Sequence, residues 1–450
     1  MKLLILFPCL FLLITSFGPT SGLLGRIKQG KETWGYVKVR DNAHMFFWLY
    51  YTTADVDYKL RPLVLWLQGG PGASSTGIGN FLEIGPQTLS LENRTNTWVK
   101  QVNLLFVDNP VGTGYSFVED PALLASNNTV IANDLVAFMK GFLAKVPEFQ
   151  TVPLYIFAES YGGKMAAQFA VSLNKAVLQK KIRCQLAGVA LGDSWVSPVD
   201  AVLSWGSYLY ATSLIDSAGL TKVNNKAQEV SDAVKAGKLG PATELWGETE
   251  NLIENVTNGV NFYNILKEPC RANSSNAIAS HTSHIFASKN QEHLYNANVG
   301  QFSAVLDALM NGPIKEKLKV IPQNVTWGGQ SQLVFKALAA DFMNSAVKNV
   351  EMLLNTTSVK VVVYNGQLDL IVTSLGAQKW VENLHWAGTK PWVNAVRKPI
   401  DGPSGATLAF SKSFKNFAFY WVLNAGHMIP ADVSDTALQM MEEIVGLKAH

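Results

Sequence analysis

Short, almost wholly apolar runs alternate with amphipathic stretches along much of this chain. Uninterrupted apolar runs of this length are typical of strands buried on both faces of a sheet. Between them, residues 130–144 and 164–178 have the spacing of helices. The apolar runs are residues 62–67, 103–107, 153–157, 186–191, 359–364 and 417–422. This alternation predicts an α/β fold with a mostly parallel central sheet flanked by helices.

The pattern changes at two places. Near the start, the β-rich residues 36–39 and 45–51 flank a polar segment at 40–42, which is the signal of a hairpin. Between about residues 198 and 311 the strand rhythm stops, and the sequence is helical and more polar. We expect this segment to be a helical insertion over one end of the sheet, within a single domain of residues 22–450.

Residues 1–21 have the pattern of a secretory signal peptide. Lys2 gives the positive start, and the apolar run at 3–14 is shorter than the ~20 residues that a membrane-spanning helix needs. No later apolar run reaches the length of a membrane span, so we expect none in the mature protein. The predicted destination is the secretory pathway, and secretion and lysosomal delivery both stay open.

Entry into the secretory pathway would allow disulfide formation between cysteines and glycosylation of asparagines. Only Cys184 and Cys270 remain after removal of the leader, and they either form a disulfide or stay as two separate buried thiols. Asn-X-Ser/Thr motifs become candidate glycosylation sites, which we expect on the surface. These motifs begin at Asn93, Asn127, Asn255, Asn273, Asn324 and Asn355.

Composition and charge exclude several classes of protein. The chain has 450 residues, of which 48% are hydrophobic and 16% are charged, and this is a globular rather than a disordered composition. The net charge of +3 and the lack of a long basic run argue against a nucleic-acid partner. A chain of this length can bury a large core without depending on disulfides or metals.

The sharpest local motif is AESYGG at residues 158–163, between a predicted strand and a predicted helix. A serine on a tight strand-to-helix turn, with small residues two positions before and after it, forms a nucleophile elbow. Here Ala158 stands where glycine is usual. We therefore predict an α/β-hydrolase fold, with Ser160 as the nucleophile at the carboxyl edge of the sheet and the helical insertion over the same end.

Two later loops supply the rest of a catalytic triad in the chain order Ser, acid, His. Asp369 follows one predicted strand, and His427 lies in a glycine-bounded loop after another. In this interpretation His427 takes the proton of Ser160 and later protonates the leaving group, while Asp369 fixes the imidazole tautomer. Asp193 also follows a predicted strand and is the competing acid, but it comes too early in the chain order.

Acyl transfer also needs N–H donors for the oxyanion. The backbone N–H of Tyr161, directly after the nucleophile, is one candidate. Residues 68–72 (QGGPG) follow an early strand, and Gly70 is our second candidate because glycine lets an amide approach the reacting carbon. A phosphate loop is the rival interpretation of this segment, but the Gly-Lys-Ser/Thr ending is missing.

The predicted chemistry requires no cofactor and no metal. His281 and His284 have a metal-like spacing, but no acidic or cysteine partner lies nearby in the sequence. We therefore expect these two histidines to lie in a solvated part of the insertion.

Together these motifs resemble the serine carboxypeptidase family, peptidase class S10, whose members are secreted or lysosomal α/β-hydrolases. The resemblance covers nearly the whole mature chain. It rests on the Ser160 elbow and on residues 66–72, 83–86, 108–116, 364–369 and 425–428.

The resemblance also implies how the end of a substrate is recognised. Family members bind the terminal carboxylate with an amide side chain and two glutamates that share a proton, and these positions fall on Gln68, Glu83 and Glu159, with Trp66 beside them. Two carboxylates held close together raise the pKa of one, which can then donate to a carboxylate ligand. We therefore expect binding to be favoured at acidic pH. Met428 is the candidate for the pocket of the leaving residue.

Two positions depart from the usual family pattern. Gln68 stands where most members have asparagine, and Ala73 stands where most have cysteine. The longer amide alters the geometry of the substrate site, and the missing cysteine removes a tether of the oxyanion loop. One branch of the family shares both departures.

Three functions remain to be weighed. The first is a serine-type carboxypeptidase that releases C-terminal residues from peptides with a free C-terminus. The second is an esterase or acyltransferase that uses the same triad, and the third is a catalytically weak binding protein on a hydrolase scaffold. The third predicts a damaged triad, whereas all three members are present. Related enzymes include dimers, so the resemblance leaves a homodimer open.

Overall fold

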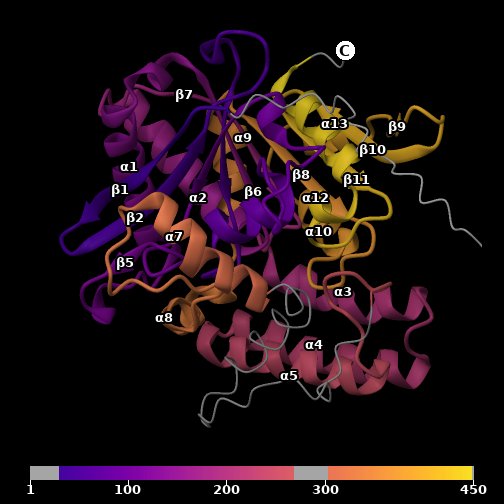
Figure 1. Cartoon of the computed structure of the whole chain (residues 1–450). Helices are drawn as coiled ribbons and strands as arrows, with labels where there is room; N and C mark the ends of the chain where they lie inside the picture. Colours follow the sequence, from indigo (N-terminus) through magenta and orange to yellow (C-terminus); the bar gives the residue numbers. More distant parts are fainter. Residues whose placement is uncertain (1–29, 268–302, 448–450) are drawn as a thin grey trace, which may run out of the picture.

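The computed structural model of this chain describes residues 30–267 and 303–447. The predicted signal peptide, Cys270, Asn273 and the histidines at 281 and 284 lie outside the described residues. In Figure 1, the described parts form a central sheet with helices packed around it.

The described residues form an 11-stranded sheet with a parallel centre. Its spatial order is β1-β2-β4-β3-β6-β7-β8-β11-β10-β9, and β5 pairs with β2. Strands β4, β3, β6, β7, β8 and β11 run parallel, and the pairs at both edges are antiparallel. The strands are β1 (Glu32–Arg40), β2 (Ala43–Tyr50), β3 (Leu63–Leu67), β4 (Asn103–Val107), β5 (Phe117–Val118), β6 (Pro153–Glu159), β7 (Gln185–Gly192), β8 (Lys360–Gly366), β9 (Lys398–Asp401), β10 (Thr407–Phe414) and β11 (Phe417–Val422).

The predicted α/β fold is thereby confirmed. Each apolar run of the sequence is a strand, and β1 and β2 are the expected hairpin. Strands β5, β9 and β10 were not predicted. Strand β5 has only two residues, and β9 and β10 are largely not buried and therefore lack an apolar run.

The two faces of the sheet bury separate cores. In β3, Leu63 and Leu65 point into one core while Val64 and Trp66 point into the other, as the two-residue period of a strand requires. Both cores are covered by helices, which explains why the central strands are apolar on both faces.

Twelve α-helices with defined bounds surround the sheet in the described part of the chain. They are α1 (Asn128–Lys145), α2 (Tyr161–Leu178), α3 (Pro198–Ala211), α4 (Ser217–Lys235), α5 (Leu239–Thr257), α7 (Lys315–Leu318), α8 (Gln332–Phe342), α9 (Val347–Thr356), α10 (Ser374–Glu382), α11 (Thr389–Val393), α12 (Ile429–Asp432) and α13 (Ser434–Val445). A π-helical segment, η2, covers Ser75–Ile84. No helix among the described residues combines the length and apolar composition needed to cross a membrane.

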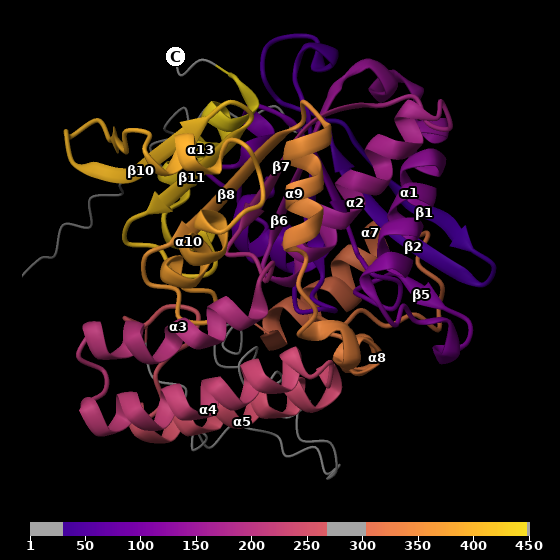
Figure 2. The ribbon, with the colours of Figure 1, turned by 180° about the vertical axis from the view of Figure 1, so that it is seen from behind.

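Helices α3, α4 and α5 gather at one end of the sheet, as both ribbon views show (Figures 1 and 2). Helix α3 contacts the loop after β8, because the Trp205 indole donates to the Ile371 carbonyl and the Tyr208 hydroxyl donates to the Gln367 carbonyl. These helices therefore lie at the carboxyl edge of the parallel strands, where ligands bind in open α/β sheets.

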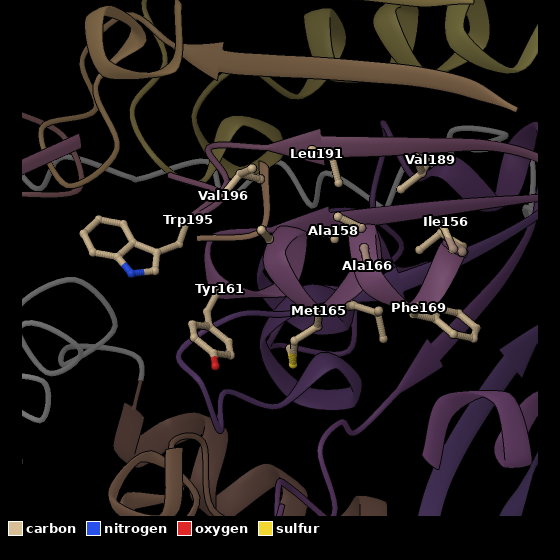
Figure 3. Close-up of a cluster of buried hydrophobic side chains, with 14 of the residues drawn as sticks. Ile156, Ala158, Tyr161, Met165, Ala166, Phe169, Val189, Leu191, Trp195 and Val196 are labelled. Atoms are coloured by element: carbon tan, nitrogen blue, oxygen red, sulfur yellow. The ribbon is translucent and has the colours of Figure 1, made fainter. Parts of the chain in front are cut away.

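Helix α2 packs closely against the two strands that lead to this edge (Figure 3). Its Ala166 and Phe169 face Ile156 of β6 and Val189 of β7, and all four are buried. Ala158, just before the turn into α2, is fully buried, and its small side chain suits a site where strand and helix approach each other.

Candidate active site

Ser160 lies on the turn between β6 and α2, with a backbone φ of 60° and ψ of −130°. A positive φ is uncommon for a non-glycine residue and is typical of a nucleophile elbow. The Ser160 N–H donates to the Gly192 carbonyl at 3.0 Å, and the Ser160 carbonyl accepts from Trp195 N–H at 2.9 Å. Both bonds fix the turn to the end of β7. Ser160 is half-buried, whereas its neighbours Glu159 and Tyr161 are buried.

The loop after β3 lies directly against this turn. A Cβ added to Gly69 would lie 2.5 Å from the Ser160 Cβ and 2.8 Å from the Tyr161 nitrogen. Only glycine fits there, so the segment that carries Gly70 is held beside the nucleophile and beside the Tyr161 N–H.

His427 and Asp369 form the acid–base pair of the site. The His427 Nδ1 and the Asp369 Oδ2 are 2.8 Å apart, and both side chains are fully buried. The His427 N–H donates to the Tyr263 carbonyl at 2.7 Å, and the Tyr263 ring packs edge-on against the imidazole. The other Asp369 oxygen accepts from the Val372 N–H at 3.2 Å.

The second imidazole nitrogen, Nε2, has no hydrogen-bond partner among the described residues. A hydrogen bond between Ser160 and His427 is therefore not formed in this structure, although catalytic bonds of this kind often tighten only with substrate bound. Burial lowers the pKa of His427 to about 4, and the charges of Asp193 and Glu83 oppose that shift. The imidazole is thus neutral over most of the acidic range, as a general base requires.

Asp193, the competing acid, makes no hydrogen bond to the imidazole. It is nevertheless close, because one ligand atom each from Asp193, Asp369 and His427 lie within 4.8 Å of one another. This is the one cluster of metal-ligand type found among the described residues. The bond between His427 and Asp369 already uses two of the atoms that a cation would need, so the arrangement suits proton transfer better than metal binding.

Hydrogen bonds hold the predicted oxyanion loop where the family pattern would have a cysteine. Ala73 forms an isolated β-bridge with Gln330, and the Gln330 amide donates to the Pro71 carbonyl at 2.7 Å. The Ser331 N–H donates to the Gly72 carbonyl at 2.8 Å. Gly70 has a φ of +105°, which favours glycine.

Asp108 braces the same loop from the end of β4, and the sequence reasoning missed it. Its buried carboxylate accepts from the Ser74 hydroxyl at 2.7 Å, from the Thr76 N–H and hydroxyl, and from the Tyr115 N–H. The sequence did contain a signal for this residue, because Asp108 begins one of the motifs that carry the family resemblance, residues 108–116.

We call the residues proposed to bind the terminal carboxylate of a substrate the carboxylate clamp. They are Trp66, Gln68, Glu83 and Glu159, and all four are buried. The Trp66 indole donates to the Gln68 Oε1 at 2.7 Å, and the Gln68 amide donates to the Glu159 Oε1 at 2.7 Å. Glu83 lies close enough for its charge to raise the pKa of Glu159, and neither Glu83 oxygen has a hydrogen-bond partner among the described residues. Gln68, Glu83 and Glu159 are each at most 4% exposed.

Burial is the main cause of the raised pKa of both glutamates. The pKa of Glu159 rises well above the usual range, and the charge of Glu83 raises it further. The charge of Arg94 opposes the rise of the pKa of Glu83. The raised pKa favours the neutral form of Glu159.

The remaining candidate residues are Met428 and the asparagines of the glycosylation motifs, and they differ in exposure. Met428 is half-buried and packs against the second core beside His427. Asn93, Asn255, Asn324 and Asn355 are exposed. Asn127 is half-buried and caps α1 by accepting from the Val130 N–H.

The thiol of Cys184 is buried and free in the structure. Its suggested partner lies outside the described residues, so the pairing stays a prediction.

Comparisons with known proteins identify the family and the fold. A model of the serine carboxypeptidase family, peptidase S10, matches residues 23–446. Retinoid-inducible serine carboxypeptidase of Mus musculus is 49% identical over 433 residues, which cover 95% of this chain and 94% of that protein. Serine carboxypeptidase-like 51 of Arabidopsis thaliana is 42% identical over 446 residues, covering 97% and 96%. A solved prohormone-processing carboxypeptidase from Saccharomyces cerevisiae has the same fold, with a TM-score of 0.78, 21% identity and coverage of 93% and 91%.

Proposed function

Because this chain belongs to the serine carboxypeptidase family, we propose that it releases C-terminal residues from peptides through an acyl-enzyme on Ser160, best at acidic pH. The observation that carries the substrate end of this proposal is the buried cluster of Gln68, Glu83 and Glu159, of which Glu159 directly precedes Ser160 in the sequence. A protonated glutamate and an amide N–H can both donate to the terminal carboxylate of a peptide.

The catalytic steps follow from the positions of the other residues. His427 takes the proton of Ser160 as the hydroxyl attacks the last peptide carbonyl, and it then protonates the departing amine. Asp369 holds the imidazole through Nδ1 and stabilises its charged form. The N–H groups of Tyr161 and Gly70 bind the oxyanion, and water then hydrolyses the acyl-enzyme.

Two titrations support activity in the acidic range. His427 acts as a base only when neutral, which its pKa of about 4 permits down to that pH. The clamp keeps its donor only while Glu159 is protonated, so substrate binding weakens as pH rises through the raised pKa of that group. We therefore expect activity in the acidic range, between the pH below which His427 is protonated and the pH above which Glu159 is ionised.

The predicted signal peptide and the exposed glycosylation motifs support a place in the secretory pathway, either secreted or lysosomal. The peptide substrate supplies its own free C-terminus, and the chemistry uses no cofactor.

A fluorophosphonate probe followed by peptide mapping tests the nucleophile. We expect the label on Ser160, and we expect its loss in His427→Ala, because the hydroxyl then has no base. Label on another residue of the folded protein would contradict the mechanism.

A matched pair of substrates separates the peptidase from an esterase or acyltransferase. We expect KM for a blocked peptide with a free C-terminus to rise by about tenfold or more as pH rises to neutral, while its C-terminal amide shows no such change. Equal pH profiles for the two substrates would favour an enzyme that does not use the clamp.

A further inference from the structure

Asp193 is a fully buried acid at the catalytic edge that the proposed mechanism leaves without a role. It follows β7 in a left-handed conformation, with a φ of +42°, and its N–H donates to the Tyr364 carbonyl of β8 at 2.8 Å. Its neighbour Gly192 accepts from the Ser160 N–H. Asp193 is thus fixed between the strand end that holds the nucleophile and the strand that leads to Asp369.

The two Asp193 oxygens have different surroundings. Oδ1 accepts from the Gly366 N–H at 2.8 Å and from the Asn365 amide at 3.3 Å. Oδ2 receives no N–H or hydroxyl donor from the described residues. Since Asp369 and His427 are the close neighbours, the second oxygen can be satisfied by donating its own proton to the Asp369 carboxylate.

We propose that Asp193 is a positioning residue of the triad: a neutral carboxyl that donates to Asp369 and orients that carboxylate toward His427. The proposal rests on the triad of the proposed function.

Charge at the site supports this distribution of protons. Burial raises the pKa of both acids well above the usual range, and the charge of Asp369 raises that of Asp193 further. Asp369 already contacts the His427 Nδ1 and accepts from the Val372 N–H, which favours its ionised form, so we assign the proton to Asp193. The other titratable groups that influence the pair are Glu159 of β6, Tyr208 of α3, Tyr364 of β8, His427 and Asp432 of α12.

A neutral Asp193 has two consequences for catalysis. It leaves one negative charge, on Asp369, to stabilise the imidazolium, and it restricts the rotation of the Asp369 carboxylate. When Asp193 ionises, repulsion between two adjacent carboxylates disturbs the acid that orients His427.

The test compares Asp193→Asn with Asp193→Ala in the full-length enzyme. Asparagine keeps the acceptor for Gly366 and Asn365 and supplies a permanent N–H donor to Asp369, whereas alanine supplies neither. We expect kcat at about pH 5 to be at least about tenfold higher in Asp193→Asn than in Asp193→Ala, with KM similar in both. Active-site titration with the fluorophosphonate normalises kcat to folded enzyme.

A second readout is the pH profile of kcat, measured with an amide substrate that does not depend on the clamp. We expect the fall of kcat toward alkaline pH to move upward in Asp193→Asn, because an amide cannot ionise. Asp401→Asn, on the exposed edge strand β9, is the control and should follow the parent profile.

Two outcomes would overturn the proposal. A loss of kcat in Asp193→Asn as large as that in Asp369→Asn would make Asp193 an ionised partner of His427. Equal normalised kcat values and pH profiles for the asparagine, alanine and parent enzymes would leave Asp193 with a structural role only. In either case a parent enzyme that labels at Ser160 and cleaves peptides leaves the proposed function intact.

Discussion

The backbone conformation of Ser160 depends on a close approach that only glycine allows. The left-handed backbone of Ser160 is held by hydrogen bonds to the end of β7, and Gly69 contacts it from the loop after β3. Strained backbone of this kind persists only where surrounding structure fixes it. The close approach of this loop to Ser160, the proposed nucleophile, and to the Tyr161 N–H therefore depends on the absence of a Cβ at Gly69.

At this scale we predict that Gly69→Ala lowers kcat by about 100-fold or more, because the added methyl displaces either Ser160 or the Tyr161 N–H, and loss of one oxyanion donor costs about that much. Steady-state kinetics on a blocked peptide measures the effect. Gly240→Ala is the matched control, since a Cβ at that helical position meets no atom within 4 Å. A Gly69→Ala enzyme with the parent kcat would show that the loop does not contribute to the oxyanion site.

Helix α2, which begins at the nucleophile, is anchored by a buried ion pair. Lys164 lies four residues after Ser160, and its Nζ is 3.1 Å from the Asp341 Oδ2 at the end of α8. The same ammonium also donates to the Asp341 carbonyl. The Tyr161 hydroxyl and the Asn128 N–H both donate to the Asp341 carboxylate, so α1 and α2 meet α8 at one point.

Removing one partner of this pair should be costly. The Lys164 side chain is 1% exposed and that of Asp341 is 10% exposed, so Lys164→Met leaves an unpaired buried charge, which typically costs about 3–5 kcal/mol. Lys226 pairs with Glu248 at the surface of α4 and α5, and Lys226→Ala should cost at most about 1 kcal/mol. Thermal unfolding of the two variants checks the ranking. A smaller shift for Lys164→Met than for Lys226→Ala would show that the buried pair does not anchor α2.

Buried acids make the stability of the whole molecule depend on pH. The pKa values of Glu159 and Asp193, the two acids to which we assign a proton, are both raised, chiefly by burial. A group with a raised pKa in the folded state binds protons more tightly there than in the unfolded chain. Its contribution to stability is therefore complete below the unfolded pKa and is lost as pH rises through the folded pKa.

The pKa values of two other buried groups, His427 and Lys164, limit the pH range in which this trend can be observed. His427 titrates near its ordinary pKa of 6.5 when unfolded and at about 4 when folded, so it is neutral in both states above about pH 7. Burial lowers the pKa of Lys164 to about 8 in the folded state, so the lysine changes the balance only near and above that value.

We therefore predict that the midpoint of thermal unfolding falls as pH rises from about 7 to about 8, because folded Glu159 and Asp193 hold protons that the unfolded chain has already released. Differential scanning fluorimetry across this range measures the shift. The Glu159→Gln variant should show a smaller slope, because one of these acids can no longer ionise. A midpoint that rises over the same interval would contradict the assignment of protonated buried acids.

Much of the fold and the strand-to-helix turn at Ser160 were predictable, because their signals are local. The apolar runs at 62–67 and 153–157 identify buried strands, since few other elements require uninterrupted apolar residues. The small residues around Ser160 identify the strand-to-helix turn by sterics alone. Edge strand β9 escaped prediction because solvent on its faces imposes no pattern.

The sequence alone determined the order of the apolar strands and of the helices between them, and it predicted the chain order of the proposed nucleophile, acid and histidine. Which buried acid pairs with which partner was decided by tertiary structure. Asp193 precedes Asp369 by 176 residues and Lys164 precedes Asp341 by 177, and no local pattern links either pair. Their contacts exist because parallel strands end at the same edge and helices pack over it, and proton sharing between acids depends on that distance and on burial.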